Sequence, residues 1–172
     1  METTTAFQVI PALLKEMEQE AKTTRKFLAR VPEEHFGWQP HPKSMTLKML
    51  ATHIAELPGW VTMGLTTAGL DFAQNPYKVK DVRATGELLD YFEETLASGL
   101  AALASAEDLT GDWILRNGDI ILQHYNKYEV IRMTMSQIIH HRAQLGVYFR
   151  LLGIPVPASY GPSADSNEFE KN

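Results

Sequence analysis

Four long segments in which apolar side chains recur every three or four residues constrain the fold of this chain more than any other feature. They run from about Ala6 to Arg30, Met45 to Thr67, Thr85 to Ser105 and Asn126 to Leu152. An amphipathic helix must bury its apolar stripe, and four helices of similar length can bury their stripes against one another. The pattern predicts an all-α four-helix bundle that forms one domain over residues 1–172.

Local signals indicate where these segments begin, bend and end. Ser44 is a predicted N-cap for the second helix, and Asn126 with Glu129 three residues later predicts a capping box for the fourth. Pro58 predicts a kink in the second helix rather than its end, because the apolar pattern resumes after it. Gly153 suits the residue that follows the fourth helix, where a positive φ is common.

The connections between the last three helices differ in character. Asn117 and Gly118 separate two short apolar runs, and both residue types tolerate a positive φ. They predict a short β-hairpin between the third and fourth helices. The stretch from Gly69 to Arg83 is polar and contains Asn75 and Pro76, so we expect a loop there.

Composition limits the chemistry and the partners of the chain. Cysteine is absent, which excludes disulfides, thiolate metal sites and cysteine nucleophiles. The net charge is −5 and the basic side chains form no cluster, so we expect no nucleic-acid partner. The sequence has no apolar run of membrane-spanning length and no signal peptide at its N-terminus, so we expect no membrane partner and a cytoplasmic location.

Histidines in the second and fourth helices face the predicted core. Successive helical residues are about 100° apart, so His140 and His141 cannot both point inward. His141 continues the apolar stripe, whereas His140 lies at its edge or in an interface. Gln137 lies one turn before His141 on the same face. In the second helix, His53 lies beside the stripe and Glu56 follows three residues later.

These residues allow two interpretations. In the simpler one, each buried imidazole hydrogen-bonds a hydroxyl, a carboxylate or a backbone carbonyl. In the other, the two helices hold one metal ion, since helical bundles build metal sites from facing helices. Spacing alone does not choose between them, because no His-x-x-x-His pair is present. Glu56 either accepts a hydrogen bond from His53 or is a solvated helix residue, and Trp60 is expected in the core or in a pocket wall.

Three separate motifs, "LATHIAELPGW", "IIHHRAQLGVYFRLLGIPVP" and "YGPSAD", resemble the DinB/YfiT-like family. The resemblance implies a four-helix bundle, a homodimer and a divalent metal, with zinc or nickel the expected ions. It implies that His53 and His141 are metal ligands and that the third ligand position falls on Gln137, where the family carries histidine. An amide oxygen is a weaker ligand for these ions than an imidazole. Gln137 therefore either coordinates through its oxygen, holds a water at the metal, or marks a site that has lost its metal.

The resemblance also implies a class of function. Relatives include thiol S-transferases that use a low-molecular-weight thiol and metal-dependent hydrolases, so we expect a metal-dependent enzyme of small-molecule chemistry from one of these two classes. Three protein ligands leave positions open for substrate, as in catalytic metal sites. The alternative is a non-catalytic dimeric bundle, stress-associated or ligand-binding, with a degenerate metal site. No catalytic residue is assigned, and Arg142 is expected to be a structural ion-pair or capping partner rather than a catalytic group.

Overall fold

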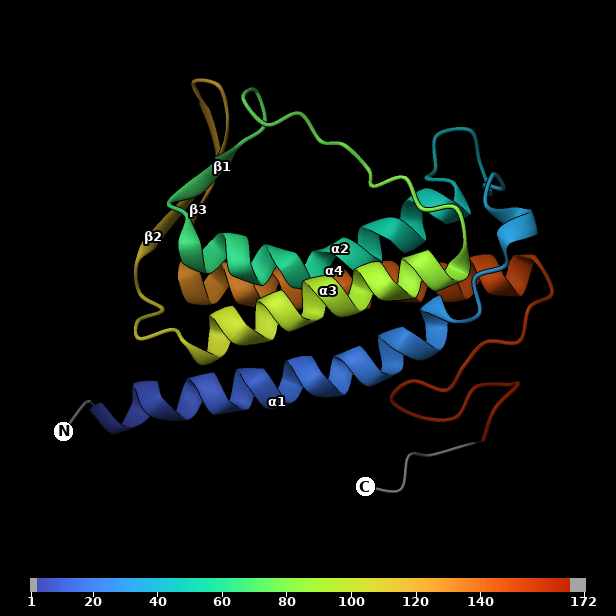
Figure 1. Ribbon diagram of the computed structural model, residues 1–172, viewed down its shortest axis with the longest axis horizontal. Helices are drawn as coiled ribbons and strands as arrows, with labels where there is room; N and C mark the ends of the chain where they lie inside the picture. The colour runs from blue at the N-terminus through green and yellow to red at the C-terminus, as the bar shows by residue number, and fades with distance from the viewer. Residues whose placement is uncertain (1–2, 168–172) are drawn as a thin grey trace.

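The computed structural model describes residues 3–167, and this part of the chain is mostly helical (Figure 1). Its four helices are α1 (Thr3–Leu28), α2 (Leu47–Thr66), α3 (Thr85–Ala104) and α4 (Lys127–Leu151). A small sheet at one end has three strands, β1 (Gly69–Asp71), β2 (Asp112–Asn117) and β3 (Ile120–Asn126), and one 3₁₀ turn (Glu33–His35) follows α1. Within residues 3–167 no helix combines the length and the apolar character that crossing a bilayer requires.

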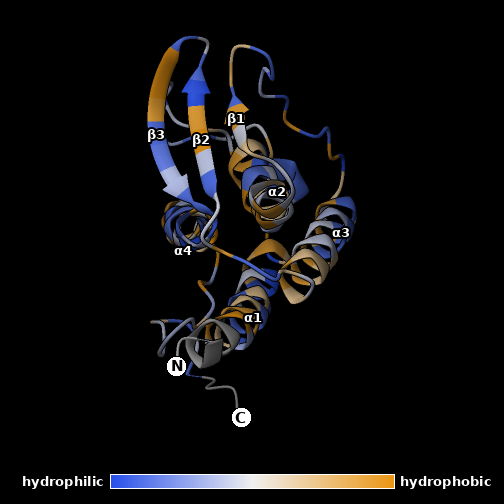
Figure 2. Cartoon of the chain, turned by 90° about the vertical axis from the view of Figure 1, so that its left-hand side faces the viewer, coloured by the Kyte–Doolittle hydropathy of each residue, from blue (hydrophilic) through white to orange (hydrophobic). Residues whose placement is uncertain are grey.

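The four helices pack around a shared apolar core. Seen along the helices, α2 and α1 lie on opposite sides of the core, with α3 and α4 between them (Figure 2). Fully buried apolar side chains come from every helix and include Leu28, Ile54, Phe92 and Ile131. Burial of an apolar side chain of this size stabilises a fold by roughly 1.5–3 kcal/mol. The predicted apolar stripes are therefore the surfaces that these helices bury.

The contact between α2 and α4 is held at both of its ends. Near the end of α2, a Cβ on Gly64 would lie 2.6 Å from Cγ1 of Val130, so only glycine allows the two helices to approach this closely. At the other end, the hydroxyl of Tyr148 donates to the carbonyl of Met45, which precedes α2, over 3.1 Å. These contacts determine how the middle of α4 faces the middle of α2.

Most of the predicted helix boundaries are confirmed. Asn126 and Glu129 form the expected capping box, Gly153 has a φ of 71°, and α2 continues through Pro58. The prediction of Ser44 as the N-cap of α2 is wrong, because the side chain of Thr46 accepts the hydrogen bond from the first turn.

The Ser44 error has a tertiary cause. The backbone N–H of Leu47 donates to the carbonyl of Trp38, and that of Lys48 donates to the carbonyl of Phe36. The preceding loop thus satisfies the first amides of the helix and shifts its start beyond Ser44.

The hairpin between α3 and α4 is confirmed, but the sheet is larger than predicted. Strands β2 and β3 pair antiparallel, and Gly118 at their turn has a φ of 60°. The expectation of a loop from Gly69 to Arg83 is wrong at its start, because Gly69–Asp71 form β1 and pair with β2 in parallel. A Cβ on Gly69 would lie 2.2 Å from the carbonyl oxygen of Ile114, so the close approach requires glycine.

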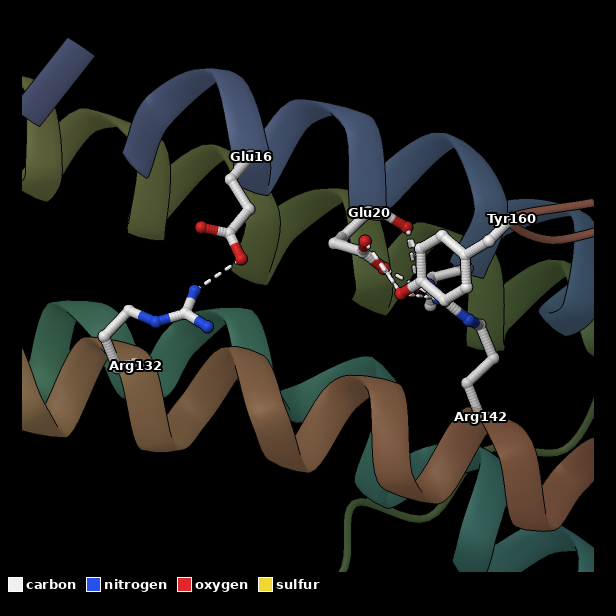
Figure 3. A network of polar contacts seen from close by, with 6 residues as sticks. Glu16, Glu20, Arg132, Arg142 and Tyr160 are labelled. Atoms are coloured by element: carbon white, nitrogen blue, oxygen red, sulfur yellow. Dashed lines mark hydrogen bonds and ion pairs between the residues drawn. The ribbon is translucent and has the colours of Figure 1, made fainter. Parts of the chain in front are cut away.

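A buried ion pair joins α4 to α1 and to the C-terminal tail (Figure 3). The guanidinium of Arg142 is 2% exposed, and its Nη2 lies 2.6 Å from the carboxylate of Glu20. Its Nη1 donates to the hydroxyl of Thr24 and to the backbone carbonyl of Glu20. The hydroxyl of Tyr160 accepts from Arg142 and donates to Glu20, both over 2.8 Å. Arg142 is therefore a structural ion-pair partner, as expected from the sequence.

We expect Glu20→Ala to lower the free energy of unfolding by about 3–5 kcal/mol, because it leaves the charge of Arg142 buried without its carboxylate. Urea unfolding followed by helical circular dichroism measures the loss. The matched control is Glu93→Ala, which breaks an exposed ion pair with Arg25 and should cost less than about 1 kcal/mol. Equal losses in the two variants would contradict the prediction.

Candidate functional site

The imidazoles of His53 and His141 lie against each other where α2 packs on α4. Their ring centroids are 4.7 Å apart and the rings meet edge to face at 75°. The side chain of His53 is 13% exposed, and His141 is half-buried. Two side chains that are distant in the sequence thus share one place, as the inward-facing positions on the two helices led us to expect.

Glu56 orients the ring of His53. Its carboxylate lies 2.7 Å from Nδ1 of His53, and Glu56 is only 8% exposed. An ionised carboxylate only accepts hydrogen bonds, so Nδ1 carries the hydrogen, and in the neutral ring Nε2 holds the lone pair. The alternative in which Glu56 is a solvated helix residue is excluded by this burial and by this contact.

Gln144 orients the ring of His141 in the same way. Its side-chain oxygen lies 2.9 Å from Nδ1 of His141, and its nitrogen donates to Nε2 of His140 over 3.1 Å. His140 is exposed and its ring centroid lies 4.9 Å from that of His141, at the edge of the site as predicted. Within residues 3–167, no hydrogen bond engages Nε2 of either His53 or His141.

Electrostatics favour the neutral form of His141. Burial lowers the pKa of His141 below its usual value; the hydrogen bond that Nδ1–H donates to Gln144 opposes this, and the nearby rings of His53 and His140 add to the lowering. A neutral imidazole offers a lone pair to a metal ion or to a proton donor. At neutral pH the site therefore presents a free nitrogen lone pair on His141.

Two aromatic side chains flank His53. The indole of Trp60 meets it at a centroid distance of 6.0 Å, and the ring of Tyr77 at 5.9 Å, both nearly perpendicular. Trp60 thus lies in the wall of the site. Burial, followed by the charge and the hydrogen bond of Glu56, raises the pKa of Tyr77 well above its usual value, so that its phenol stays protonated.

Tyr77 is the site residue that sequence reasoning missed. It lies in the loop between β1 and α3, outside every helical stripe, and its hydroxyl is 3.3 Å from Nδ1 of His53. A half-exposed aromatic residue in a polar loop was the available signal, and such residues often have no role in a site.

Gln137 remains a predicted ligand. It is half-buried and lies one turn before His141 on α4, and within the described residues it makes no hydrogen bond to either imidazole. In residues 3–167 no group of three or more histidine, aspartate or glutamate side chains is arranged to hold a metal ion. The structure therefore brings together two of the three residues predicted to bind metal.

The pair of imidazoles fits a divalent ion such as zinc or nickel. Both ions bind neutral imidazole nitrogen, and in the neutral form of each ring the lone pair is on Nε2, because Nδ1 donates to a hydrogen-bond acceptor. A ligand histidine in a metal site almost always donates its other N–H to such an acceptor. The site has two imidazoles rather than three, so a third ligand is Gln137 or comes from outside the chain.

Comparison with known proteins identifies relatives over nearly the whole chain. The sequence model described as the DinB family matches residues 1–171. The uncharacterized protein YrdA of Bacillus subtilis (strain 168) is 25% identical over 161 residues, which are 92% of each chain.

Solved structures share the fold. A DinB-like protein from Bacillus cereus ATCC 10987 is 22% identical with a TM-score of 0.67, over 86% of this chain and 95% of that one. A mycothiol-dependent maleylpyruvate isomerase is 15% identical with a TM-score of 0.55, over 80% of this chain and 60% of that one. At these identities the likeness shows the fold alone.

In the presence of a chelator, we expect acidification to reduce the free energy of unfolding more for the natural chain than for His141→Gln. The pKa of His141 is lowered in the folded state, so the unfolded chain takes up the proton first. The stability that the neutral ring of His141 contributes is therefore fully present above about pH 6.5. It is lost as the pH falls from there towards the pKa that the ring has in the folded state.

Urea unfolding at a series of pH values measures this difference. His41→Gln, at an exposed loop position, is the control and should follow the natural chain. Parallel pH profiles for the natural chain and His141→Gln would show that burial does not disfavour the charged ring.

Proposed function

Because this chain belongs to the DinB family, we propose that it is a divalent-metal-dependent enzyme that acts on a small molecule. The proposal places the metal between α2 and α4, held by His53, His141 and Gln137. The proposal assumes the four-helix bundle predicted from the sequence, because the metal site requires α2 and α4 to lie side by side.

One observation carries this proposal: the ring centroids of two imidazoles from facing helices lie 4.7 Å apart, and within residues 3–167 no hydrogen bond engages the Nε2 atom of either ring. Neither Nε2 is among the fully buried polar atoms that lack a partner in residues 3–167, so both reach solvent and are open to an incoming ligand. Here the Nδ1 atoms are engaged by Glu56 and Gln144, while the Nε2 atoms are not. This is the arrangement that metal ligands adopt.

Each residue of the site has a role under this proposal. A bound divalent ion with open positions supplies Lewis acidity, which brings a thiol or a water to its nucleophilic form near neutral pH. Glu56 and Gln144 hold the ligand rings with Nδ1 protonated. Trp60 and Tyr77 restrict access of water to the side of His53, which strengthens electrostatic interactions within the site.

A low-molecular-weight thiol is the substrate class to test first. The fold is shared with a mycothiol-dependent isomerase, a protein whose activity requires such a thiol. Thiolate sulfur is a soft ligand that binds zinc well, so an open coordination position suits it. The transfer would join the thiol sulfur to an electrophilic carbon, while the leaving group departs from that carbon with its electron pair. Hydrolysis of a small molecule is the other reaction class.

A second candidate function follows from the incomplete set of ligands. No group of three histidine, aspartate or glutamate side chains is arranged for a metal within residues 3–167, and the third ligand position implied by the resemblance carries a glutamine, Gln137. A non-catalytic bundle that binds a small ligand or a second copy of the chain would need no metal. The exposed apolar side chains of β3, Ile120 to Leu122, provide a surface for such an association.

We expect the natural chain to bind about one zinc ion, measured by competition with a chromophoric chelator and by metal analysis. His141→Ala should weaken binding by more than the roughly tenfold to hundredfold typical of losing an outer-shell partner. Gln137→His should tighten it by at least about tenfold, or about 1.4 kcal/mol, because it completes a set of three imidazoles.

The control is His124→Ala, at an exposed position on β3, which should bind zinc as the natural chain does. Zinc content near zero in every form would support the second candidate function. Unchanged affinity in Gln137→His would place position 137 outside the coordination sphere.

We further expect transfer of a low-molecular-weight thiol, mycothiol included, to a small electrophile at a rate that depends on metal. Chelation should abolish turnover, added zinc or nickel should restore it, and His53→Ala should lower it by at least about hundredfold. Steady-state rates with several thiols measure this effect, with His124→Ala as the control. Turnover that survives both chelation and His53→Ala would exclude the proposed chemistry.

A further inference from the structure

The side chain of Gln144 links the two adjacent imidazoles of α4. Gln144 follows His140 by four residues and His141 by three, and helical residues at these spacings are neighbours on the helix surface. Its amide oxygen lies 2.9 Å from Nδ1 of His141, and its amide nitrogen donates to Nε2 of His140 over 3.1 Å. Within residues 3–167, these are the hydrogen bonds of the Gln144 side chain. Each end of the amide therefore has one imidazole as its partner.

The amide of Gln144 differs in one respect from the carboxylate of Glu56, which orients the other ring. An ionised carboxylate only accepts, so Glu56 holds Nδ1 of His53 as a donor whichever oxygen makes the contact. An amide has an acceptor at its oxygen and donors at its nitrogen. If the amide of Gln144 were turned end for end, it would donate to Nδ1 of His141, and the hydrogen of that ring would then be on Nε2. Contact with Gln144 is therefore not enough by itself to leave the lone pair of His141 on Nε2.

His140 determines which end of the amide faces His141. Because Nε2 of His140 accepts from the amide nitrogen, the amide oxygen is directed to Nδ1 of His141. A reversed amide would place its oxygen against Nε2 of His140, where two acceptors would meet unless this ring also moved its hydrogen. Reversal of the amide thus requires both rings to change tautomer together.

We propose that His140 is a positioning residue that acts through Gln144: its Nε2 selects the orientation of the amide, whose oxygen then holds His141 with Nδ1 protonated and the lone pair on Nε2. This inference deepens the proposed function, on which it rests for what Nε2 of His141 then binds. The first of the two adjacent histidines thereby acts on the site without binding the metal.

The first measurement does not depend on metal. Nitrogen-15 NMR of the metal-free chain, at a pH where the imidazoles are neutral, reports which ring nitrogen of His141 carries the hydrogen. We expect the Nδ1–H tautomer to dominate in the natural chain and in His140→Glu, because a carboxylate accepts from the amide nitrogen as Nε2 does. In His140→Lys the new side chain only donates, so the amide should reverse and the hydrogen of His141 should move to Nε2.

The matched controls are Ser136→Glu and Ser136→Lys. Ser136 is exposed on α4 one turn before His140, so these variants add the same charges to the same part of the helix without a contact to Gln144. Both should keep the natural tautomer of His141. All four substitutions lie at exposed helical positions, where a change usually costs little stability.

The second measurement is zinc affinity in a double-mutant cycle. We expect His140→Lys to weaken zinc binding by about tenfold more than Ser136→Lys does, the lower end of what outer-shell changes cause. In chains that already carry Gln144→Leu, the two lysine substitutions should have equal effects, because the amide that transmits the difference is gone.

The outcomes separate this inference from the proposed function. A natural chain that binds no zinc ends the proposed function, while the tautomer measurement still decides the role of His140. The same tautomer of His141 in His140→Glu and His140→Lys overturns the inference, whether or not zinc binds. A larger effect of His140→Lys that persists in Gln144→Leu also overturns it, because His140 would then act directly on the neighbouring ring of His141.

Discussion

The packing of α2 on α4 is the contact on which the rest of this molecule depends. Gly64 allows the two helices to approach at one end, and Tyr148 ties them at the other through the carbonyl of Met45. His53 and His141 lie between these two points, on facing surfaces.

Successive residues of α4 serve opposite sides of the fold. His141 faces α2 and meets His53, whereas Arg142 faces α1 and is paired with Glu20. The rotation of about 100° between neighbouring helical residues makes this division possible. One helix thus contributes to the candidate site and to the buried ion pair, and the tail residue Tyr160 closes that ion pair from outside (Figure 3).

The hydrogen bonds around the site engage Nδ1 of each ring, and within residues 3–167 none engages the two Nε2 atoms. Glu56 and Gln144 engage the opposite nitrogen of each ring, and burial disfavours the charged form of His141. The two proposed functions differ in what they require of the site. A metal-dependent enzyme needs a third ligand for its ion, from Gln137 or from the substrate, whereas a non-catalytic binding protein does not. Membership in the DinB family favours the first, and the glutamine at position 137 is the reason to keep the second.

The features that the sequence determined by itself are local. Helical periodicity, the capping box at Asn126, the turn at Gly118 and the inward position of His141 all depend on residues within a few positions of one another, and each was predicted correctly. Tertiary structure alone decided the pairing of β1 with β2, the start of α2 at Leu47, the burial of Glu56 and the placement of Tyr77 on His53. In each of these cases the partner lies far along the chain or in a loop without a periodic pattern. Local propensity carries no information about such a partner, because the interaction exists only after the helices have packed.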